Sequence, residues 1–168
     1  MPQRASSEAR WCMFPSLHDN VSSLLEDDGL HFTFYPIDRD TGCIKSYDTN
    51  IMGKFRCNNQ TCKATGWGSR KIAITIRRFR NQRYNARVYY QRCKRCKTLR
   101  EPEVDDSYAD RVAYRLKSWS GVEQERRPFS GTSNGPHERS LCEGCKAGHC
   151  NDASEVDNLA GRFANYAL

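Results

Sequence analysis

The sequence predicts an α+β fold in which a β-hairpin forms the core and an α-helix packs on it. Apolar side chains alternate along residues 72–76 and 84–90, and they recur every three or four positions along residues 108–119. Cysteines occur in pairs on either side of the alternating region. A period of two is typical of a half-buried strand, and a spacing of three or four is typical of one helix face. A chain of 168 residues is long enough for one domain with appendages.

The predicted hairpin has one apolar face on each of its strands. Its first strand carries Ile72, Ile74 and Ile76, and its second carries Tyr84, Ala86, Val88 and Tyr90. The turn lies at Asn81-Gln82-Arg83, a length and composition that suit a hairpin. The predicted helix follows, with Asp105 or Asp106 as its N-cap and Gly121 closing its C-terminus. Its apolar stripe is Tyr108, Val112, Leu116 and Trp119.

A short helix and a short strand are expected before the hairpin. Leu17, Val21, Leu24 and Leu25 have helical spacing after Pro15, with Ser16 as a plausible N-cap. Residues 30–35 alternate as a strand, and residues 38–50 are expected to form a loop. We therefore divide the chain into an N-terminal extension over residues 1–46, a central domain over residues 47–150 and a tail over residues 151–168. Residues 126–136, rich in Ser, Gly and Pro, are expected to form a linker.

The charge is distributed very unevenly along the chain. The formal net charge is +7 and the apolar fraction is 38%, with a mean hydropathy of −0.83. Residues 53–100 hold fifteen of the 27 Lys and Arg residues and not one Asp or Glu, whereas the other 120 residues are net acidic. A cationic segment of this kind indicates a polyanionic partner, nucleic acid first and an anionic membrane surface second. The alternative is a sheet face that pairs with the acidic segments of the same chain.

Two classes of protein are excluded by these patterns. The longest apolar runs, such as residues 72–74, are far shorter than the roughly 20 residues that a membrane-spanning helix needs. No charged n-region followed by an apolar h-region is readable at the N-terminus. We therefore expect an intracellular protein, cytoplasmic or nuclear and not secreted, whose nine cysteines bind metal and do not form disulfides.

Four cysteines flank the predicted hairpin. Cys57-x4-Cys62 precedes it and Cys93-x2-Cys96 follows it. Because a hairpin brings its two ends together, these thiols are expected to meet at one point. Four thiolates in a closed tetrahedral arrangement are typical of a structural zinc site. The layout predicts a zinc ribbon or a treble-cleft-like relative of it.

A second metal site is predicted from Cys142-x2-Cys145-x4-Cys150. Three cysteines need a fourth ligand, and His137 is the preferred candidate because His149 is adjacent to Cys150. Neighbouring residues rarely point at the same ion, so His149 is the alternative, and a water or a residue from elsewhere is a third option. We thus expect two Zn²⁺ ions in the protein. The two remaining cysteines, Cys12 and Cys43, are expected to be small buried side chains.

Catalytic zinc and redox chemistry do not fit the pattern. A zinc deaminase needs H-x-E and then P-C-x-x-C, but here Glu138 follows His137 directly and Leu141 precedes Cys142. The Cys93-x2-Cys96 pair follows a strand and starts no helix, unlike a redox motif. We therefore expect no enzymatic activity and no small-molecule substrate.

The cysteine pattern resembles that of the three-CxxC-type zinc-finger family, which includes the receptor-transporting and zygote-arrest proteins. The segments that carry the resemblance are residues 53–57, 66–69, 84–86, 91–96, 108–119 and 141–146. The chain is most similar to short, anchor-free, mostly fungal members, and its first pair departs from the pattern with x4 in place of x2. The resemblance implies zinc binding at Cys57, Cys62, Cys93, Cys96, Cys142, Cys145 and Cys150. Among relatives it implies messenger-RNA binding in one branch and receptor trafficking in another.

The hairpin itself offers a candidate nucleic-acid surface. If its isoleucine face packs on the helix, the opposite face presents Lys71, Arg77, Phe79, Arg87 and Tyr89. Basic side chains can contact phosphates while aromatic rings stack on unpaired bases, so single-stranded RNA is the favoured partner. The alternative for Phe79 and Tyr89 is a cross-strand aromatic pair covered by the N-terminal helix. The alternative function is a protein–protein adaptor or a trafficking or chaperone-like module, stabilised by zinc and without enzymatic activity.

Overall fold

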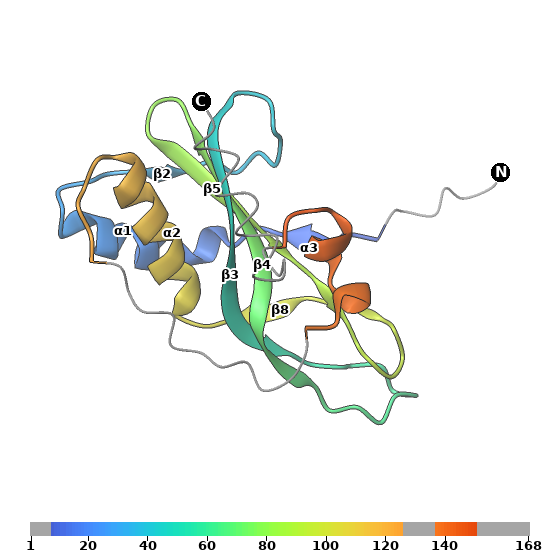
Figure 1. The fold of residues 1–168 in the computed structure, drawn as a ribbon. Coiled ribbons are helices and arrows are strands. Elements are labelled where there is room, and N and C mark those ends of the chain that lie inside the picture. Colours follow the sequence, from blue (N-terminus) through green and yellow to red (C-terminus); the bar gives the residue numbers. More distant parts are fainter. Residues whose placement is uncertain (1–7, 126–136, 151–168) are drawn as a thin grey trace, which may run out of the picture.

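A computed structural model describes residues 8–125 and 137–150, so the predicted linker and the predicted tail over residues 151–168 lie outside the described residues. One six-stranded sheet, in the order β1-β5-β4-β3-β8 with β2 also paired to β5, forms its centre (Figure 1). The strands are β1 (Trp11–Cys12), β2 (Thr33–Phe34), β3 (Cys43–Phe55), β4 (Trp67–Phe79), β5 (Arg83–Tyr89) and β8 (Pro102–Val104). A separate small hairpin consists of β6 (Gln91–Arg92) and β7 (Leu99–Arg100).

The helical elements are short except for one. They are η1 (Pro15–Leu17), α1 (His18–Glu26), α2 (Ser107–Trp119), η2 (Arg139–Leu141) and α3 (Glu143–Lys146). The predicted N-cap Ser16 falls inside η1, and Leu17 occupies the N-cap position of α1 without a side-chain hydrogen bond. No helix among the described residues is both long and apolar enough to cross a bilayer.

The predicted hairpin is present as β4 and β5. A three-residue loop, residues 80–82, joins Phe79 to its partner Arg83, and Asn81 and Gln82 in this loop have left-handed φ angles of 61° and 52°. Ile74 pairs with Val88 and Ile76 with Ala86. The hairpin is therefore present, but Arg83, which was expected in the turn, begins β5 and pairs with Phe79. Its isoleucines share one face.

The strand β3 was not expected from the sequence. Residues 43–50 lie in the predicted loop, yet β3 pairs with β4 from Cys43 opposite Phe79 to Phe55 opposite Trp67. Its first half is mostly exposed and polar, so no apolar alternation marks it, and pairing with β4 supplies the order. The 46/47 boundary falls inside this strand, and β1 and β2 both pair with β5. The N-terminal extension is therefore part of the same sheet as the central domain.

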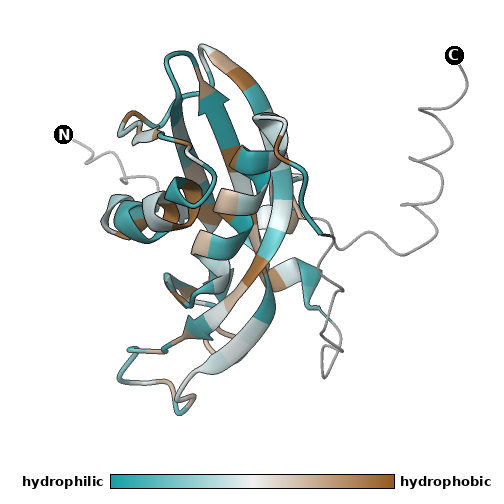
Figure 2. Ribbon diagram, turned by 90° about the vertical axis from the view of Figure 1, so that its left-hand side faces the viewer, coloured by the Kyte–Doolittle hydropathy of each residue, from teal (hydrophilic) through white to brown (hydrophobic). Residues whose placement is uncertain are grey.

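One face of the sheet carries the apolar core. Helices α1 and α2 lie side by side on this face (Figure 1), and their buried residues Val21, Leu25, Val112 and Leu116 belong to one cluster with the three hairpin isoleucines. Hydropathy alternates along the helices and strands (Figure 2), as a one-sided core requires. The predicted packing of the helix on the isoleucine face is thus present.

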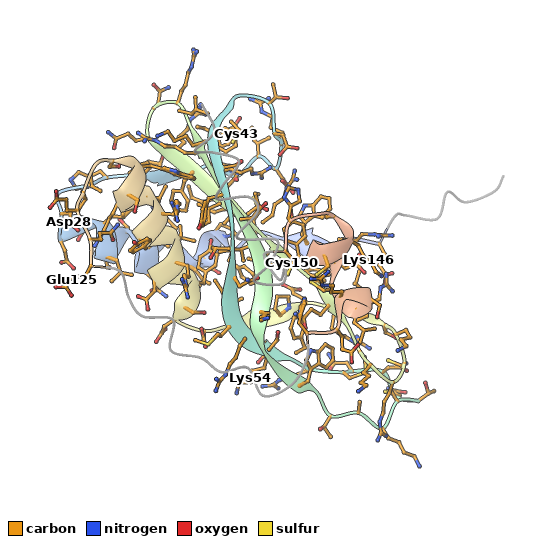
Figure 3. The ribbon with its side chains drawn as sticks, viewed as in Figure 1. Asp28, Cys43, Lys54, Glu125, Lys146 and Cys150 are labelled. Carbon is orange, nitrogen blue, oxygen red and sulfur yellow. The ribbon has the colours of Figure 1, made fainter. Side chains whose placement is uncertain are left out.

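The opposite face is covered as well, which the sequence did not predict. The segment 35–42 lies over one part of it, and α3 lies over another on the far side from α1 and α2 (Figure 1). Every residue from Ile72 to Arg77 is buried. Figure 3 shows Cys43 near one end of β3, Lys54 near the other, and Lys146 and Cys150 beside α3.

Candidate metal centres

The first group of ligands forms where two strands end. Cys57 and Cys62 follow β3, and Cys93 and Cys96 follow β6, so the β3–β4 and β6–β7 hairpins bring all four together. The Sγ atoms of Cys57 and Cys96 are 3.6 Å apart, and those of Cys62 and Cys93 are 3.9 Å apart. A tetrahedron with Zn–S bonds of about 2.3 Å has S···S edges of about 3.8 Å. The four thiols therefore have the spacing of a zinc site.

The second group forms around α3. The Nε2 atom of His137 lies 3.3 Å from the Sγ atom of Cys145 and 3.6 Å from that of Cys150. Zn–N and Zn–S bonds of about 2.05 and 2.3 Å give an N···S edge of about 3.5 Å. Cys142 is the N-cap of α3, where its Sγ atom accepts a hydrogen bond of 3.3 Å from the amide of Cys145. All four ligand atoms lie within 4.8 Å of one another.

His149, the alternative fourth ligand, points elsewhere. Its Nδ1 atom lies 3.1 Å from each carboxylate oxygen of Asp48, and its ring stacks on Tyr89 with centroids 5.7 Å apart. Asp48 also accepts a hydrogen bond from Thr75 on β4. The structure thus brings His137 to the thiols, and it uses His149 to fasten the segment before Cys150 to the sheet.

The thiols in both groups have strongly divided proton affinities. Hydrogen bonds with the side chain and backbone of Thr98 lower the pKa of Cys96 to about 5. Hydrogen bonding with Cys150 lowers the pKa of Cys142 to about 4 in spite of its burial, and the pKa of Cys150 is raised in return. In each group one thiol loses its proton readily, and the negative charge of this thiolate disfavours deprotonation of the neighbouring thiols. A divalent cation removes this opposition, because it neutralises several thiolates at once.

A comparison with protein-family models identifies the family. A model described as a zinc-binding domain, the 3CxxC zinc ribbon, matches residues 50–148. The chain belongs to this family. No curated protein and no solved structure gives a significant match. The match includes six of the seven ligand cysteines and His137, while Cys150 lies just beyond it.

The 3CxxC domain therefore binds zinc at two sites. Soft thiolate and borderline imidazole donors in tetrahedral array suit Zn²⁺, and all nine cysteines are free thiols. Each site supplies four protein ligands, which is the arrangement of structural zinc. When bound, the ion at the first site cross-links two segments that are 31 to 39 positions apart, whereas the ion at the second site closes the local segment 137–150.

Buried contacts join the second site to the sheet. The side chain of Glu143 is 1% exposed and pairs with Arg10, Arg92 and Lys146. Although burial opposes its charge, hydrogen bonds from Arg92 and Lys146 hold the pKa of Glu143 below its usual value. Gly144 sits so close to Ala73 and Tyr89 that a side chain there would collide with Ala73. The site is thus packed against β4 and β5.

The predicted nucleic-acid face is not open to a ligand. Arg77, Phe79 and Tyr89 are each only 2% exposed. Arg77 donates hydrogen bonds of 2.8 Å to Asn85 and to Asp38 and one of 2.9 Å to Asp40. Arg87 pairs with Asp38 and lies over the Trp11 ring, which also contacts Tyr89 edge to face.

The prediction of this face is wrong because acidic residues of the N-terminal segment neutralise the hairpin. The alternative prediction was a sheet face that pairs with the chain's own acidic segments, and Arg77 and Arg87 do pair in this way. The cover consists of the segment 35–42, β1 and α3, however, and not of the N-terminal helix as the aromatic-pair alternative held. Phe79 packs on Tyr35, with ring centroids 4.7 Å apart, and not on Tyr89.

The two extra cysteines are not fully buried. Both are half-buried, and the thiol of Cys12 lies 3.6 Å from a carboxylate oxygen of Glu101. Burial and this carboxylate raise the pKa of Cys12 to about 12. Cys43 donates to the carbonyl of Lys45. Neither lies among the ligand groups of the described residues.

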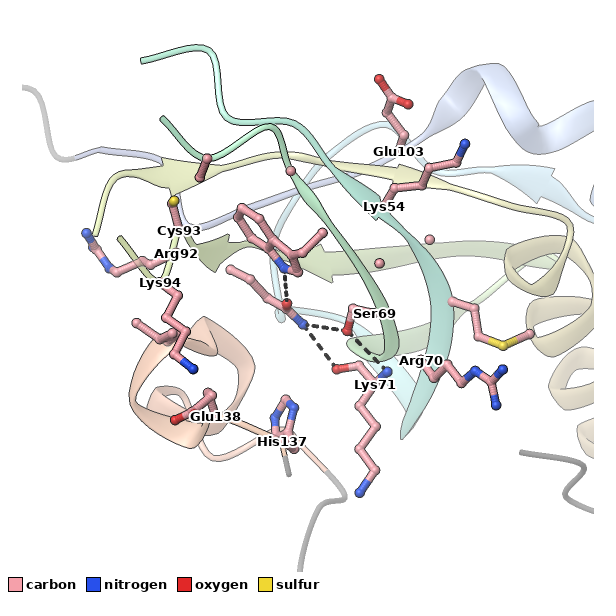
Figure 4. Close-up of a pocket in the computed structure, with 18 of the residues that line it drawn as sticks. Lys54, Ser69, Arg70, Lys71, Arg92, Cys93, Lys94, Glu103, His137 and Glu138 are labelled. Carbon is pink, nitrogen blue, oxygen red and sulfur yellow. Dashed lines mark hydrogen bonds between the residues drawn. The ribbon is translucent and has the colours of Figure 1, made fainter. Parts of the chain in front are cut away.

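A groove of about 900 Å³ separates the two zinc sites. Its lining includes Cys93 from the first site and His137 from the second, and Figure 4 shows Lys71, Lys94 and His137 around it. The basic side chains of the lining come from β3, from β4 and from the segment around Cys93: Lys54, Arg70, Lys71, Arg92, Lys94 and Arg95. The acidic ones are Glu103, Asp105 and Glu138.

Only Lys71 of the predicted nucleic-acid residues lines this groove. Sequence reasoning placed the other basic residues in the cationic segment but did not group them. Most of these basic residues lie close in sequence to a cysteine pair. Because zinc ligation brings the cysteine pairs together, that proximity could have predicted a shared basic surface.

Proposed function

We propose that this 3CxxC domain is a non-enzymatic, zinc-stabilised module that binds single-stranded nucleic acid, RNA in preference, along the groove between its zinc sites. The observation that carries the proposal is that six basic residues line this one groove, of which Arg92 is already paired with Glu143 and the other five are Lys54, Arg70, Lys71, Lys94 and Arg95. Glu103, one of its three acidic residues, pairs with Arg56 at 2.9 Å and so carries a partly neutralised charge. The net charge of the lining attracts a polyanion.

The shape of the groove supports a strand in preference to a duplex. Its lining includes Trp67 and Gly68 at the start of β4, and a side chain built at Gly68 would meet nothing within 4 Å, so a ligand can approach the backbone there. The Trp67 ring is half-buried and stacks on Phe55 with an interplanar angle of 10°, and its Nε1–H donates to Gln91. This fixed ring is a platform of the kind on which unpaired bases stack.

The zinc ions are inferred to be structural for a further reason. Their four-ligand sites hold the walls of the groove, and no ligand position is left for a reacting water. The first ion positions Lys94 and Arg95, which lie between its ligands Cys93 and Cys96. The second ion positions His137, its own ligand, which also lines the groove.

The test is fluorescence anisotropy with a labelled 12-nucleotide RNA over a salt series. A strand contacting about five phosphates gives a log–log slope of about −3.5. We expect Arg70→Ala/Lys94→Ala to weaken binding at least tenfold and to reduce the slope by about 1.4, since two phosphate contacts are lost. The matched control, Lys45→Ala/Arg111→Ala, removes two basic residues that do not line the groove.

Zinc content separates a lost contact from a lost fold. Both double variants should retain two zinc ions by elemental analysis. Equal weakening in the control, or no RNA binding by the zinc-loaded protein at about 50 mM salt, contradicts the proposal. The second outcome favours the protein-adaptor alternative.

A further inference from the structure

A second cationic hollow lies at the other end of the β3–β4 ribbon. It has a volume of about 390 Å³ and is lined by the residues around the β4–β5 turn and the start of β3. Its charged residues are Arg39, Arg80 and Arg83, and its lining contains no carboxylate. The groove between the zinc sites shares none of these residues.

Two of the three arginines of this hollow are held in place without counter-charges. The Cζ atom of Arg83 lies 4.4 Å from the centre of the Tyr35 ring, and that of Arg39 lies 5.7 Å from it. The Nε atom of Arg83 donates to the carbonyl of Arg80 at 2.9 Å. Tyr35 is 6% exposed and packs on Phe79, so the ring that orients both guanidinium groups is itself fixed.

The neighbouring carboxylates are committed to the other side of the segment 35–42. Asp38 and Asp40 pair with Arg77 and Arg87. Among the described residues, none of the three arginines of the hollow makes an ion pair with an acidic side chain. Three like charges that line one hollow without an anion repel one another, and the repulsion is relieved when an anion binds.

Backbone geometry leaves room for that anion. Gly42 has a φ angle of +82°, and a side chain built there would meet nothing within 4 Å. The amide of Cys43 bonds to the carbonyl of Asp40, so the segment forms a fixed turn at the edge of the hollow. The hollow that the three arginines line is thus bordered on one side by Gly42.

We propose that this hollow is a phosphate-monoester site. A guanidinium group binds phosphate oxygens in a bidentate manner, and three of them match a monoester, which carries nearly two negative charges at neutral pH. A phosphodiester carries only one. The ligand class is therefore a terminal phosphate, whether of a mononucleotide or of a 5′-phosphorylated RNA end.

The site is independent of the proposed groove. Cys43 pairs with Phe79 at this end of the ribbon and Gly53 with Ser69 at the other, a separation of about 30 Å along the strands. A strand bound in the groove would need several nucleotides to reach it.

The test is amide and arginine Nε NMR of the zinc-loaded protein. Inorganic phosphate, adenosine monophosphate and adenosine are titrated at constant ionic strength, followed by one short RNA with and without a 5′-phosphate. We expect saturable shifts at Gly42, Cys43 and the Nε atom of Arg83 with inorganic phosphate and the monophosphate, and none with adenosine. With RNA, shifts at these nuclei should require the 5′-phosphate.

Variants separate this site from the groove. Arg39→Gln/Arg83→Gln should raise the dissociation constant for inorganic phosphate at least tenfold, whereas Arg70→Ala/Lys94→Ala should leave it unchanged. Arg83→Lys keeps the positive charge but loses the bidentate guanidinium group, so its dissociation constant for inorganic phosphate should be intermediate. This milder variant keeps the test valid if the double variant misfolds. Equal shifts with adenosine, unsaturable shifts with inorganic phosphate, or an unchanged constant in Arg39→Gln/Arg83→Gln would overturn the proposal.

Discussion

The two ends of the sheet are stabilised by different means. At the end covered by α1 and α2, sixteen buried residues form one hydrophobic cluster around the hairpin isoleucines. At the zinc end, none of residues 56–66, all of which the structure describes, is buried. The chain there has too few apolar side chains to fix its loops, so metal ligands do it. A chain with a 38% apolar fraction thus concentrates its core in one half and its metal in the other.

The two zinc sites also differ in how much buried structure surrounds them. The first joins an exposed loop, residues 56–66, to a loop in which only Cys93 is buried, whereas the second fastens α3 to the sheet through buried Glu143 and Gly144. Loss of the first site should therefore free loops only, and loss of the second should expose a sheet face.

The largest expected effect is the difference between Cys142→Ala and Cys57→Ala. Each variant should retain one zinc ion. Cys142→Ala should lower the free energy of unfolding by more than about 4 kcal/mol, because the sheet face beneath α3 is uncovered. Cys57→Ala should lower it by about 1–3 kcal/mol.

Elemental analysis and urea unfolding check both values. Hydrogen exchange should show lost protection at Ala73 and Tyr89 in Cys142→Ala alone. Equal destabilisation by the two variants would remove the distinction between the sites.

A smaller effect is expected at Gly144. Replacement by alanine drives a methyl group into Ala73, and overpacking of this kind costs about 1–3 kcal/mol. The matched control is Gly68→Ala, because a side chain at 68 meets nothing within 4 Å. Thermal unfolding with both zinc ions retained is the measurement. If the two alanine variants unfold at the same temperature, α3 does not pack on the sheet at Gly144 as described.

An effect within the same range is expected at the metal-free end. Asp38→Asn removes the charge beside Arg77, which is 2% exposed, and should lower the free energy of unfolding by about 2 kcal/mol at pH 7. The control is Asp28→Asn, whose partner Lys117 is 16% exposed, with an effect below about 1 kcal/mol.

The effect of Asp38→Asn should depend on pH. Burial opposes the charge of Asp38, but hydrogen bonds from Arg77, Trp11 and Arg87 hold its pKa below the usual value. Its stabilisation is therefore fully present above the unfolded-state pKa of about 3.9 and is lost as pH falls through the lower folded-state pKa. Urea unfolding of both proteins from pH 7 to 3 measures this. If the difference in free energy of unfolding between the two proteins stays constant down to pH 3, Asp38 does not have the lowered pKa described. Both proteins have the same zinc ligands, so loss of zinc at low pH affects both equally and cancels in the difference.

Much of the fold was predictable because it is local. The hairpin follows from alternation on both sides of a short turn, and α2 follows from a stripe that begins at Tyr108. The strand β3 could not be predicted, because the polar residues of its first half owe their order to β4. Burial of Arg77 could not be predicted either, since its partners Asp38 and Asp40 lie some 40 positions away.

The sequence by itself determined the zinc chemistry and the cationic segment. Ligand type and spacing fix the metal, and His137 could be preferred over His149 from adjacency alone. Only the tertiary structure decided which cations face solvent. Charge is a property of residues, but exposure depends on what packs over them. Here the segment 35–42 neutralises one group of arginines and leaves a second group facing an open hollow.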